Sequence, residues 1–244
     1  MSTEQLVLAS VLMTFAAAVH GSVGFGANLL IGPLLASISP DFVPAPIVLT
    51  GVVINLVVMW REPKVPDDID RRPWYQLRWA LGGLVPGSIL GALTVAAIPK
   101  DDLSVMVAIL VLVATGLVAA GVSVVRTNRT LFATGTASGY MSAAGGIGGA
   151  PIALVHADIE GAEFRRTMSR FLSASAALSI ITLTAVGELG RTEVGIALAL
   201  MPGVAVGLVA SEWIRPRVDR GRVKPFVLAI IAASATLVLV RSVM

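Results

Sequence analysis

The chain has 244 residues, of which 56% are hydrophobic and only 14% are charged, and its mean hydropathy is +0.87. Soluble domains carry about 25% charged residues, so a water-soluble fold is excluded and much of the surface must face lipid. The absence of cysteine excludes disulfides and thiolate metal sites. The net charge of +3 does not indicate a nucleic-acid partner, because the basic residues lie in short loops between apolar runs and not along one aromatic-rich face.

Eight stretches of the chain contain no Asp, Glu, Lys or Arg, and they predict the membrane-embedded segments. A helix needs roughly 20 residues to span a ~30 Å hydrocarbon layer, and six of the runs suit one crossing each when flanking residues are added. In chain order the runs are Gln5–Pro40, Phe42–Trp60, Trp79–Pro99, Leu103–Val125, Thr130–Ala157, Phe171–Gly187, Val194–Ser211 and Pro225–Val240.

The first and fifth runs do not fit a single crossing. They hold 36 and 28 residues, too many for one span and too few for two full ones, and both are interrupted by glycines near the middle. This combination predicts a hairpin or a re-entrant segment that enters the membrane and returns. The N-terminal Met1-Ser-Thr-Glu4 lacks the basic start of a signal peptide, so the first run is expected in the mature protein.

The same two runs also resemble each other, which predicts an internal duplication. His20-Gly-Ser-Val-Gly-Phe-Gly-Ala-Asn-Leu-Leu-Ile-Gly-Pro33 corresponds to Ser138-Gly-Tyr-Met-Ser-Ala-Ala-Gly-Gly-Ile-Gly-Gly-Ala-Pro151, with the prolines 118 positions apart. Pro86-Gly-x-x-x-Gly91 recurs as Pro202-Gly-x-x-x-Gly207, 116 positions later. Residues 1–125 and 126–244 are therefore predicted to be two repeats of one membrane domain, a common plan among secondary transporters.

The distribution of basic residues predicts how the two repeats are oriented. Lys and Arg concentrate in short cytoplasmic loops. If all eight runs alternated across the membrane, with the N-terminus inside, nine basic residues would lie on each side. If the first and fifth runs return to the side they entered, with Arg61–Arg78 inside, the count becomes fifteen inside and three outside. The predicted fold is thus an all-α integral membrane protein of two inverted repeats, each with a Gly-rich hairpin and three transmembrane helices.

Inverted repeats with broken helices predict a binding site near the bilayer midplane. Helix N-termini at such breaks present unpaired N–H groups and a partial positive charge, which favour an anion. Glycine permits the close backbone approach that such a site needs. The alternative is that these glycines only allow tight helix packing. The candidate binding glycines are Gly24, Gly26, Gly145, Gly146, Gly148 and Gly149.

Several polar residues in or beside the apolar runs are further candidates. His20 precedes the first glycine cluster, and an ionisable group there is a candidate for proton coupling, although it could equally bond to a neighbouring helix. Arg170 and Ser173 share one face at the start of the sixth run; Arg170 is expected to bind the anion or else to anchor the helix at the cytoplasmic surface. Polar residues that could line the path, or bond to neighbouring helices, are Asn28, Thr50, Asn55 and Ser142.

An enzyme is the less favoured class. The sequence shows no buried carboxylate pair and no His-Glu-x-x-His helix, and no cofactor or metal is expected. Ser22 or Ser142 with a histidine could form an intramembrane serine protease, but neither histidine lies in a supporting motif. An anion channel, another small-solute permease or a ligand-gated sensor remains an alternative on the same scaffold.

The glycine hairpin that ends in Pro33, its repeat Ala144–Pro151 and the paired Pro-Gly-x-x-x-Gly motifs resemble the TauE/SafE sulfite exporter family of bacterial transporters. The resemblance covers nearly the whole chain. It implies movement of a small sulfur-containing anion, sulfite or an organosulfonate, across the bacterial cytoplasmic membrane, with export expected. One departure is Gly24-Phe-Gly-Ala-Asn28, where the family more often has a run of glycines; it leaves Asn28 near the expected site. With no ATPase motif, coupling to protons or to the membrane potential is a hypothesis.

Overall fold

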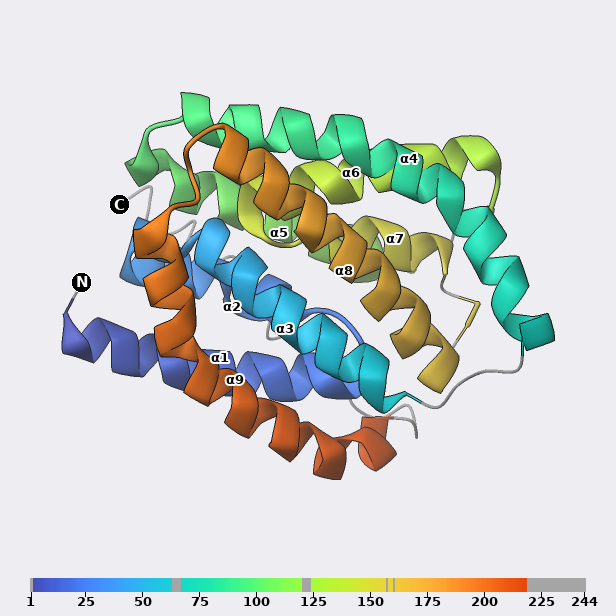
Figure 1. The fold of residues 1–244 in the computed structure, drawn as a ribbon, viewed down its shortest axis with the longest axis horizontal. Helices are drawn as coiled ribbons and strands as arrows, with labels where there is room; N and C mark the ends of the chain where they lie inside the picture. Colours follow the sequence, from blue (N-terminus) through green and yellow to red (C-terminus); the bar gives the residue numbers. More distant parts are fainter. Residues whose placement is uncertain (1, 63–66, 120–123, 157, 160, 219–244) are drawn as a thin grey trace.

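The computed structural model describes residues 2–62, 67–119, 124–156, 158–159 and 161–218, and within these ranges the fold is entirely helical (Figure 1). The eighth apolar run, Pro225–Val240, lies outside the described residues. Helix suits these sequences because the backbone satisfies its own N–H and C=O groups within the segment. In chain order the elements are α1 (Thr3–Val23), α2 (Ala27–Ile38), the 3₁₀ helix η1 (Pro40–Phe42), α3 (Ala45–Arg61), α4 (Asp67–Ala97), α5 (Lys100–Ala119), α6 (Asn128–Gly145), α7 (Gly149–Val155), α8 (Gly161–Ala185) and α9 (Arg191–Val218).

Five of these helical segments are long and apolar enough to cross a membrane. They are Thr3–Val23, Pro40–Arg61, Leu77–Ala97, Gly161–Ala185 and Arg191–Arg217. A shorter apolar segment, Asp102–Leu117, lies in α5. The chain is therefore a membrane protein with several helical spans.

The first glycine-rich run forms two helices joined by a sharp break, which we call the first break (Gly24–Gly26). Gly24 and Gly26 have φ of 96° and 99°, a left-handed conformation that other residues adopt only with strain. The end of α2 lies beside the start of α1, where Gln5 Nε2 donates a hydrogen bond of 3.1 Å to the Ile38 carbonyl.

The fifth run repeats this arrangement around the second break (Gly146–Gly148). Gly146 ends α6 with φ of 72°, and α7 begins directly after Gly148. The end of α7 lies beside the start of α6, where Arg126 Nε donates to the Val155 carbonyl at 3.2 Å. In both runs the chain thus returns close to the end from which it started.

Helices from the two halves of the chain pack closely against each other along their glycines. A Cβ added at Gly83, Gly87 or Gly91 of α4 would lie 2.0–2.5 Å from a backbone oxygen of α6. A Cβ at Gly203 or Gly207 of α9 would lie 2.4 or 2.2 Å from one of α1. Small residues let helix backbones approach in this way inside membranes. Pair α4–α6 and pair α1–α9 flank α3 and α8, which cross the middle of the molecule (Figure 1).

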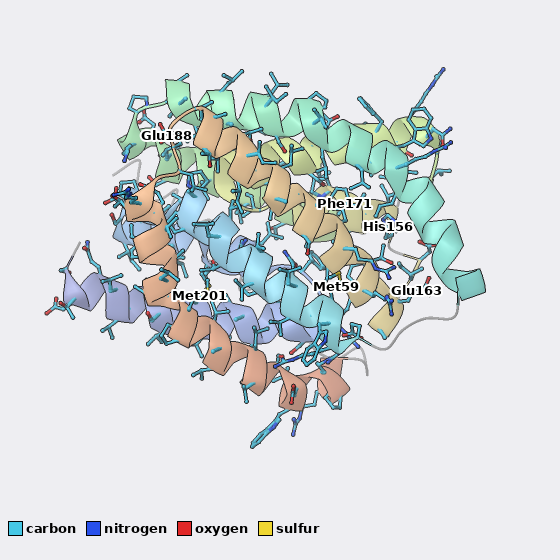
Figure 2. The ribbon with its side chains drawn as sticks, in the orientation of Figure 1. Met59, His156, Glu163, Phe171, Glu188 and Met201 are labelled. Carbon is cyan, nitrogen blue, oxygen red and sulfur yellow. The ribbon has the colours of Figure 1, made fainter. Side chains whose placement is uncertain are left out.

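Ion pairs tie together the ends of helices that are distant in sequence. Arg61 and Glu212 join the ends of α3 and α9 at 3.5 Å, and Arg126, just before α6, pairs with Asp158, just after α7. Lys100, at the start of α5, lies 3.8 Å from Asp41 in η1. Figure 2 shows the two ends of α8, with Glu163 near its start and Glu188 beyond its end on opposite sides of the molecule.

Candidate functional site

A cavity lies where the two breaks meet in the middle of the fold. The space open to the centres of water-sized molecules is about 30 Å³, enough for roughly two waters. Eight of the thirteen residues predicted for the site line it: His20, Gly26, Asn28, Asn55, Ser142, Gly146, Gly148 and Gly149. The remaining lining residues are Leu29, Val48, Gly51, Ile147, Leu172 and Ala176.

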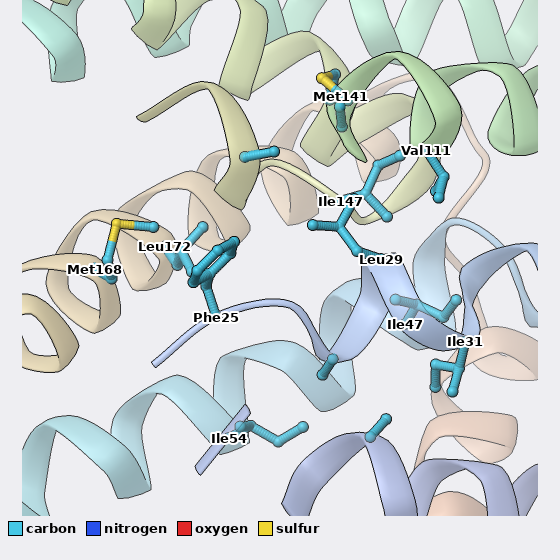
Figure 3. Packing of buried hydrophobic residues seen from close by; sticks show 14 of the residues in the cluster. Phe25, Leu29, Ile31, Ile47, Ile54, Val111, Met141, Ile147, Met168 and Leu172 are labelled. Carbon is cyan, nitrogen blue, oxygen red and sulfur yellow. The ribbon is translucent and has the colours of Figure 1, made fainter. Parts of the chain in front are cut away.

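Asn28 joins the two breaks directly. It stands in the first turn of α2, and its Nδ2 donates a hydrogen bond of 2.6 Å to the carbonyl of Gly146, 118 residues later. Gly51 of α3 gives the amide room, since a Cβ there would lie 3.3 Å from Nδ2. Apolar side chains pack around this junction: Figure 3 shows Phe25 directed toward Leu172 and Ile147 toward Leu29.

His20 and Asn55 form a buried polar pair on another wall of the cavity. His20 Nε2 lies 3.0 Å from Asn55 Oδ1, and both residues are 4% exposed. Because Oδ1 can only accept, the imidazole donates through Nε2. The Asn55 amide nitrogen is then a hydrogen-bond donor on a residue that faces the cavity.

The backbone groups at the breaks differ in how well they are satisfied. Carbonyls at the ends of the incoming helices have partners: Gly146 O accepts from Asn28, and Ser22 O accepts from Arg165 Nη1 at 3.4 Å. The outgoing helices begin at Gly26 and Gly148, and neither has a side-chain cap. The first N–H groups of a helix have no intrahelical partner, so the unsatisfied groups at the breaks are mainly donors. An environment of this polarity suits an anion.

Five of the predicted residues lie away from the cavity lining. Gly24 packs against Arg165, whose Cγ would lie 2.7 Å from an added Cβ. Thr50 Oγ1 bonds back to the carbonyls of its own helix at Pro46 and Ile47. Gly145 faces Val107 of α5, at 3.3 Å from an added Cβ.

Arg170 and Ser173 lie in α8, which contributes Leu172 and Ala176 to the cavity. Ser173 Oγ is buried and accepts or donates no hydrogen bond among the described residues. The roles predicted for Arg170 in anion binding and for His20 in proton coupling stay predictions.

A buried ionic cluster near the first break was not predicted. Glu62, the C-cap of α3, accepts from Arg165 Nε at 2.7 Å and also from Arg215 Nη2. The Glu62 side chain is 1% exposed and that of Arg165 is 6% exposed. The cluster thus joins α3, α8 and α9 to the end of α1, and we call it the Glu62 cluster.

An aromatic pair, Phe25 and Phe164, lies beside this cluster. Phe25 stands between Gly24, which contacts Arg165, and Gly26, which lines the cavity. The rings of Phe25 and Phe164 meet edge to face with centroids 5.7 Å apart. Phe25 also packs against Gly149, the first residue of α7 after the second break; its ring would lie 3.3 Å from a Cβ added there. The sequence could not indicate that Glu62 is buried, because it lies in a charged stretch between two apolar runs. Phe25, in contrast, could be noticed in the sequence, because it interrupts a run of glycines.

Comparison with known proteins agrees with this architecture. The family model for the sulfite exporter TauE/SafE matches residues 9–238, nearly the whole chain. No curated protein and no solved structure matches the chain. The match includes both glycine-broken runs and all five candidate spans, with only the first residues of α1 outside it. The chain therefore belongs to the TauE/SafE sulfite exporter family.

Proposed function

We propose that the chain is a secondary transporter that carries a small sulfur-containing anion, of the sulfite or organosulfonate class, out of the cell across the bacterial cytoplasmic membrane. The observation that carries the proposal is the cavity shared by two helix breaks, which is lined by the uncapped residues Gly26 and Gly148 that precede α2 and α7. Half-helices whose N-termini point at an anionic substrate group are a recurring feature of transporter sites. Family membership supports transport, not catalysis.

The described ion pairs support a topology of inverted repeats with two re-entrant hairpins. In that arrangement Arg61, Glu62, Asp158, Arg165 and Arg215 all lie on the cytoplasmic side, whereas Asp41 and Lys100 lie outside. Glu62 pairs with Arg165 and Arg215, and Asp41 pairs with Lys100, so each pair joins residues of one side. Simple alternation of the eight runs would put Glu62 and Arg215 on opposite faces of the membrane. A salt bridge could not form across that distance.

The size of the cavity favours the smaller members of the substrate class. A space for about two waters suits an inorganic oxyanion such as sulfite better than an organosulfonate, which needs the breaks to separate. We propose that the anion oxygens bind the first N–H groups of α2 and the amide of Asn55, with Ser142 as a further hydroxyl partner.

The experiment that tests this proposal is a binding titration on detergent-purified protein with sulfite, thiosulfate, sulfate, sulfoacetate and taurine. Gly148→Ala is the diagnostic variant, because the added Cβ would lie 2.5 Å from Ser138 O and would displace the second break. We expect it to weaken sulfite binding at least about tenfold, since helix ends act only at close range. Gly116→Ala in α5 is the matched control, with nothing within 4 Å of its Cβ.

Binding that is equal in the two glycine variants would contradict a site between the breaks.

The same titration tests whether Arg170 binds the anion. Arg170→Gln should weaken binding more than Arg217→Gln, whose exposed side chain donates to Trp213 O and lies where a charge contributes little. If the two arginine variants bind sulfite equally well, Arg170 only anchors α8 at the cytoplasmic surface.

A further inference from the structure

Asn28 carries an unsatisfied hydrogen-bond acceptor beside the cavity. Its Nδ2 is committed to Gly146 O at 2.6 Å, which fixes the orientation of the amide, because the flipped amide would set two oxygens against each other. Its Oδ1 is buried and receives no hydrogen bond from the described residues. A buried acceptor left unpaired is destabilising, and native proteins seldom keep one without a reason. The missing partner must be a donor.

The cavity has little positive charge with which to balance a doubly charged solute. None of its described lining residues is a lysine or an arginine, and His20 is the one titratable side chain among them. Around Asn28 itself, α3 presents Gly51 and Asn55, and the second break presents Gly146, all neutral. Arg165, which packs against Gly24 of the first break, is paired with Glu62. Burying a second negative charge without a counter-ion is costly.

We propose that Asn28 selects a singly charged oxyanion that bears a hydrogen-bond donor, such as hydrogen sulfite, over the corresponding dianion. The solute donates its O–H to Asn28 Oδ1, and its charged oxygens accept from Asn55 Nδ2 and from the N–H groups that begin α2. This inference rests on the proposed function. It specifies the protonation state of the substrate and names Asn28 as the residue that recognises it. A solute in this form carries its proton with it through the membrane.

The test compares three probes by calorimetric titration of the full chain in detergent. Hydrogen sulfite is a monoanion with a donor, nitrate is a monoanion without one, and sulfate is a dianion without one. We expect hydrogen sulfite to bind at least about tenfold more tightly than nitrate, because a site built around a hydrogen bond rejects solutes that lack the group. The affinity for total sulfite should fall about tenfold per pH unit once the pH exceeds the pKa of the hydrogen sulfite ion itself.

Nitrate does not titrate in this range, so any pH dependence that it shows reports the protein, His20 included, and is subtracted. Sulfate or nitrate binding as tight as that of hydrogen sulfite would overturn the inference. An affinity for total sulfite that stays constant above the solute pKa would do the same. If no probe binds at any pH, the proposed function fails instead, so the two failures are distinguishable.

Asn28→Leu locates the selectivity. It removes the acceptor, so the ratio of the affinities for hydrogen sulfite and nitrate should fall to about one, whatever the loss of the bond to Gly146 O does to both affinities. Asn128→Leu, which alters an exposed asparagine at the start of α6, is the matched control and should keep the preference. A preference that survives in Asn28→Leu would show that another group accepts the O–H of the solute and would overturn the assignment. The wild-type comparison of probes stands even if Asn28→Leu does not fold.

Discussion

Glu62 is a buried carboxylate, and a buried charge is destabilising unless it is paired. Its side chain is 1% exposed, and its Oε1 receives hydrogen bonds from arginines of α8 and α9. Such a cluster is stable only while its members stay together, because removal of one partner leaves a buried charge uncompensated. Arg165 adds a bond to the Ser22 carbonyl, so the cluster also holds the end of α1 at the first break.

Glu62→Gln should therefore lower the free energy of unfolding by about 3–5 kcal/mol, since Arg165 keeps its charge without a counter-ion. Glu212→Gln is the matched control: Glu212 pairs with Arg61 but is 52% exposed, and its loss should cost at most about 1 kcal/mol. Unfolding by a denaturing detergent, followed by circular dichroism, measures both. Equal losses in the two variants would show that the Glu62 cluster is hydrated.

His20 lies on the cavity wall and donates to Asn55. If it couples transport to protons, His20→Gln should leave solute binding nearly intact, because glutamine can also donate to Asn55 Oδ1. It should flatten the pH dependence of transport over the range in which the His20 imidazole changes its charge. Transport into proteoliposomes, with rates compared at equal concentration of the singly charged solute, provides the measurement. An unchanged pH profile would restrict His20 to a structural role.

Individual residues also show where sequence reasoning succeeds and where it ends. The glycines at the breaks, Asn28 and Asn55 were predictable because polar or helix-breaking residues in apolar runs are conspicuous. The bond between Asn28 and Gly146 was not, since it joins positions 118 residues apart and depends on tertiary packing. Counting loop charges treats every arginine as solvated, so it could not distinguish Arg165, which is buried, from Arg217, which is exposed.

At the scale of helices, the glycines of α4 and α9 determine how closely neighbouring helices approach. Gly83 faces Phe132 O and Gly87 faces Thr136 O, whereas Gly203 faces Ser10 O and Gly207 faces Thr14 O. In the register of the Pro-Gly motifs, Gly87 corresponds to Gly203, 116 residues later, but the oxygens that they face, Thr136 O and Ser10 O, are 126 residues apart. The hairpin prolines place the runs that hold α1 and α6 118 residues apart, so the two registers do not agree. Motif spacing indicated the duplication but could not fix its packing register.

Gly87→Ala should separate α4 from α6, because the added Cβ would lie 2.0 Å from the Thr136 carbonyl oxygen. Overpacking of this kind costs about 1–3 kcal/mol of unfolding free energy. Gly82→Ala, on the open face of the same helix with nothing within 4 Å, should be neutral or stabilising by up to about 1 kcal/mol through helix propensity. Thermal melting followed by circular dichroism compares the two. A melting temperature that is unchanged in Gly87→Ala would contradict the close α4–α6 contact.

At the scale of the whole molecule, the direction in which each segment crosses the membrane determines how the site can open to either side. The first break lies beside the Glu62 cluster, whereas the second break packs on apolar Ile47, 2.7 Å from the Cβ that Gly146 lacks. Gly24 of the first break thus packs on a buried, ion-paired arginine, whereas Gly146 of the second break packs on an apolar side chain. In transporters with inverted repeats, alternating access moves one repeat against the other around a fixed site, so we expect these two contacts to change between the outward-open and inward-open states.

The absence of cysteine from the native chain makes this topology directly measurable. Single cysteines at Asp158 and Glu212, both exposed, should react only from the cytoplasm, and a cysteine at exposed Asp102 only from outside. The reason is that Asp158 and Glu212 pair with Arg126 and Arg61, which lie in the arginine-rich loops assigned to the cytoplasm, whereas Asp102 follows Lys100 at the opposite end. Each substitution removes at most an exposed ion pair and should leave the fold intact.

A charged maleimide applied to intact cells and to inverted vesicles gives the readout, and a membrane-permeant maleimide that labels every variant confirms that each thiol can react. The decisive comparison is between Arg129 and Asp158, which flank the fifth run, and not between Asp158 and Glu212. The fifth run precedes Asp158, and the sixth and seventh runs separate it from Glu212. Two crossings bring the chain back to the same face in either topology, so shared labelling of these two alone is uninformative. Arg126 and Asp158 flank the fifth run, and a cysteine at Arg129 must therefore label from the same side as one at Asp158. Labelling of these two positions from opposite faces would make the fifth run a full crossing and would remove the inverted arrangement on which the shared site depends.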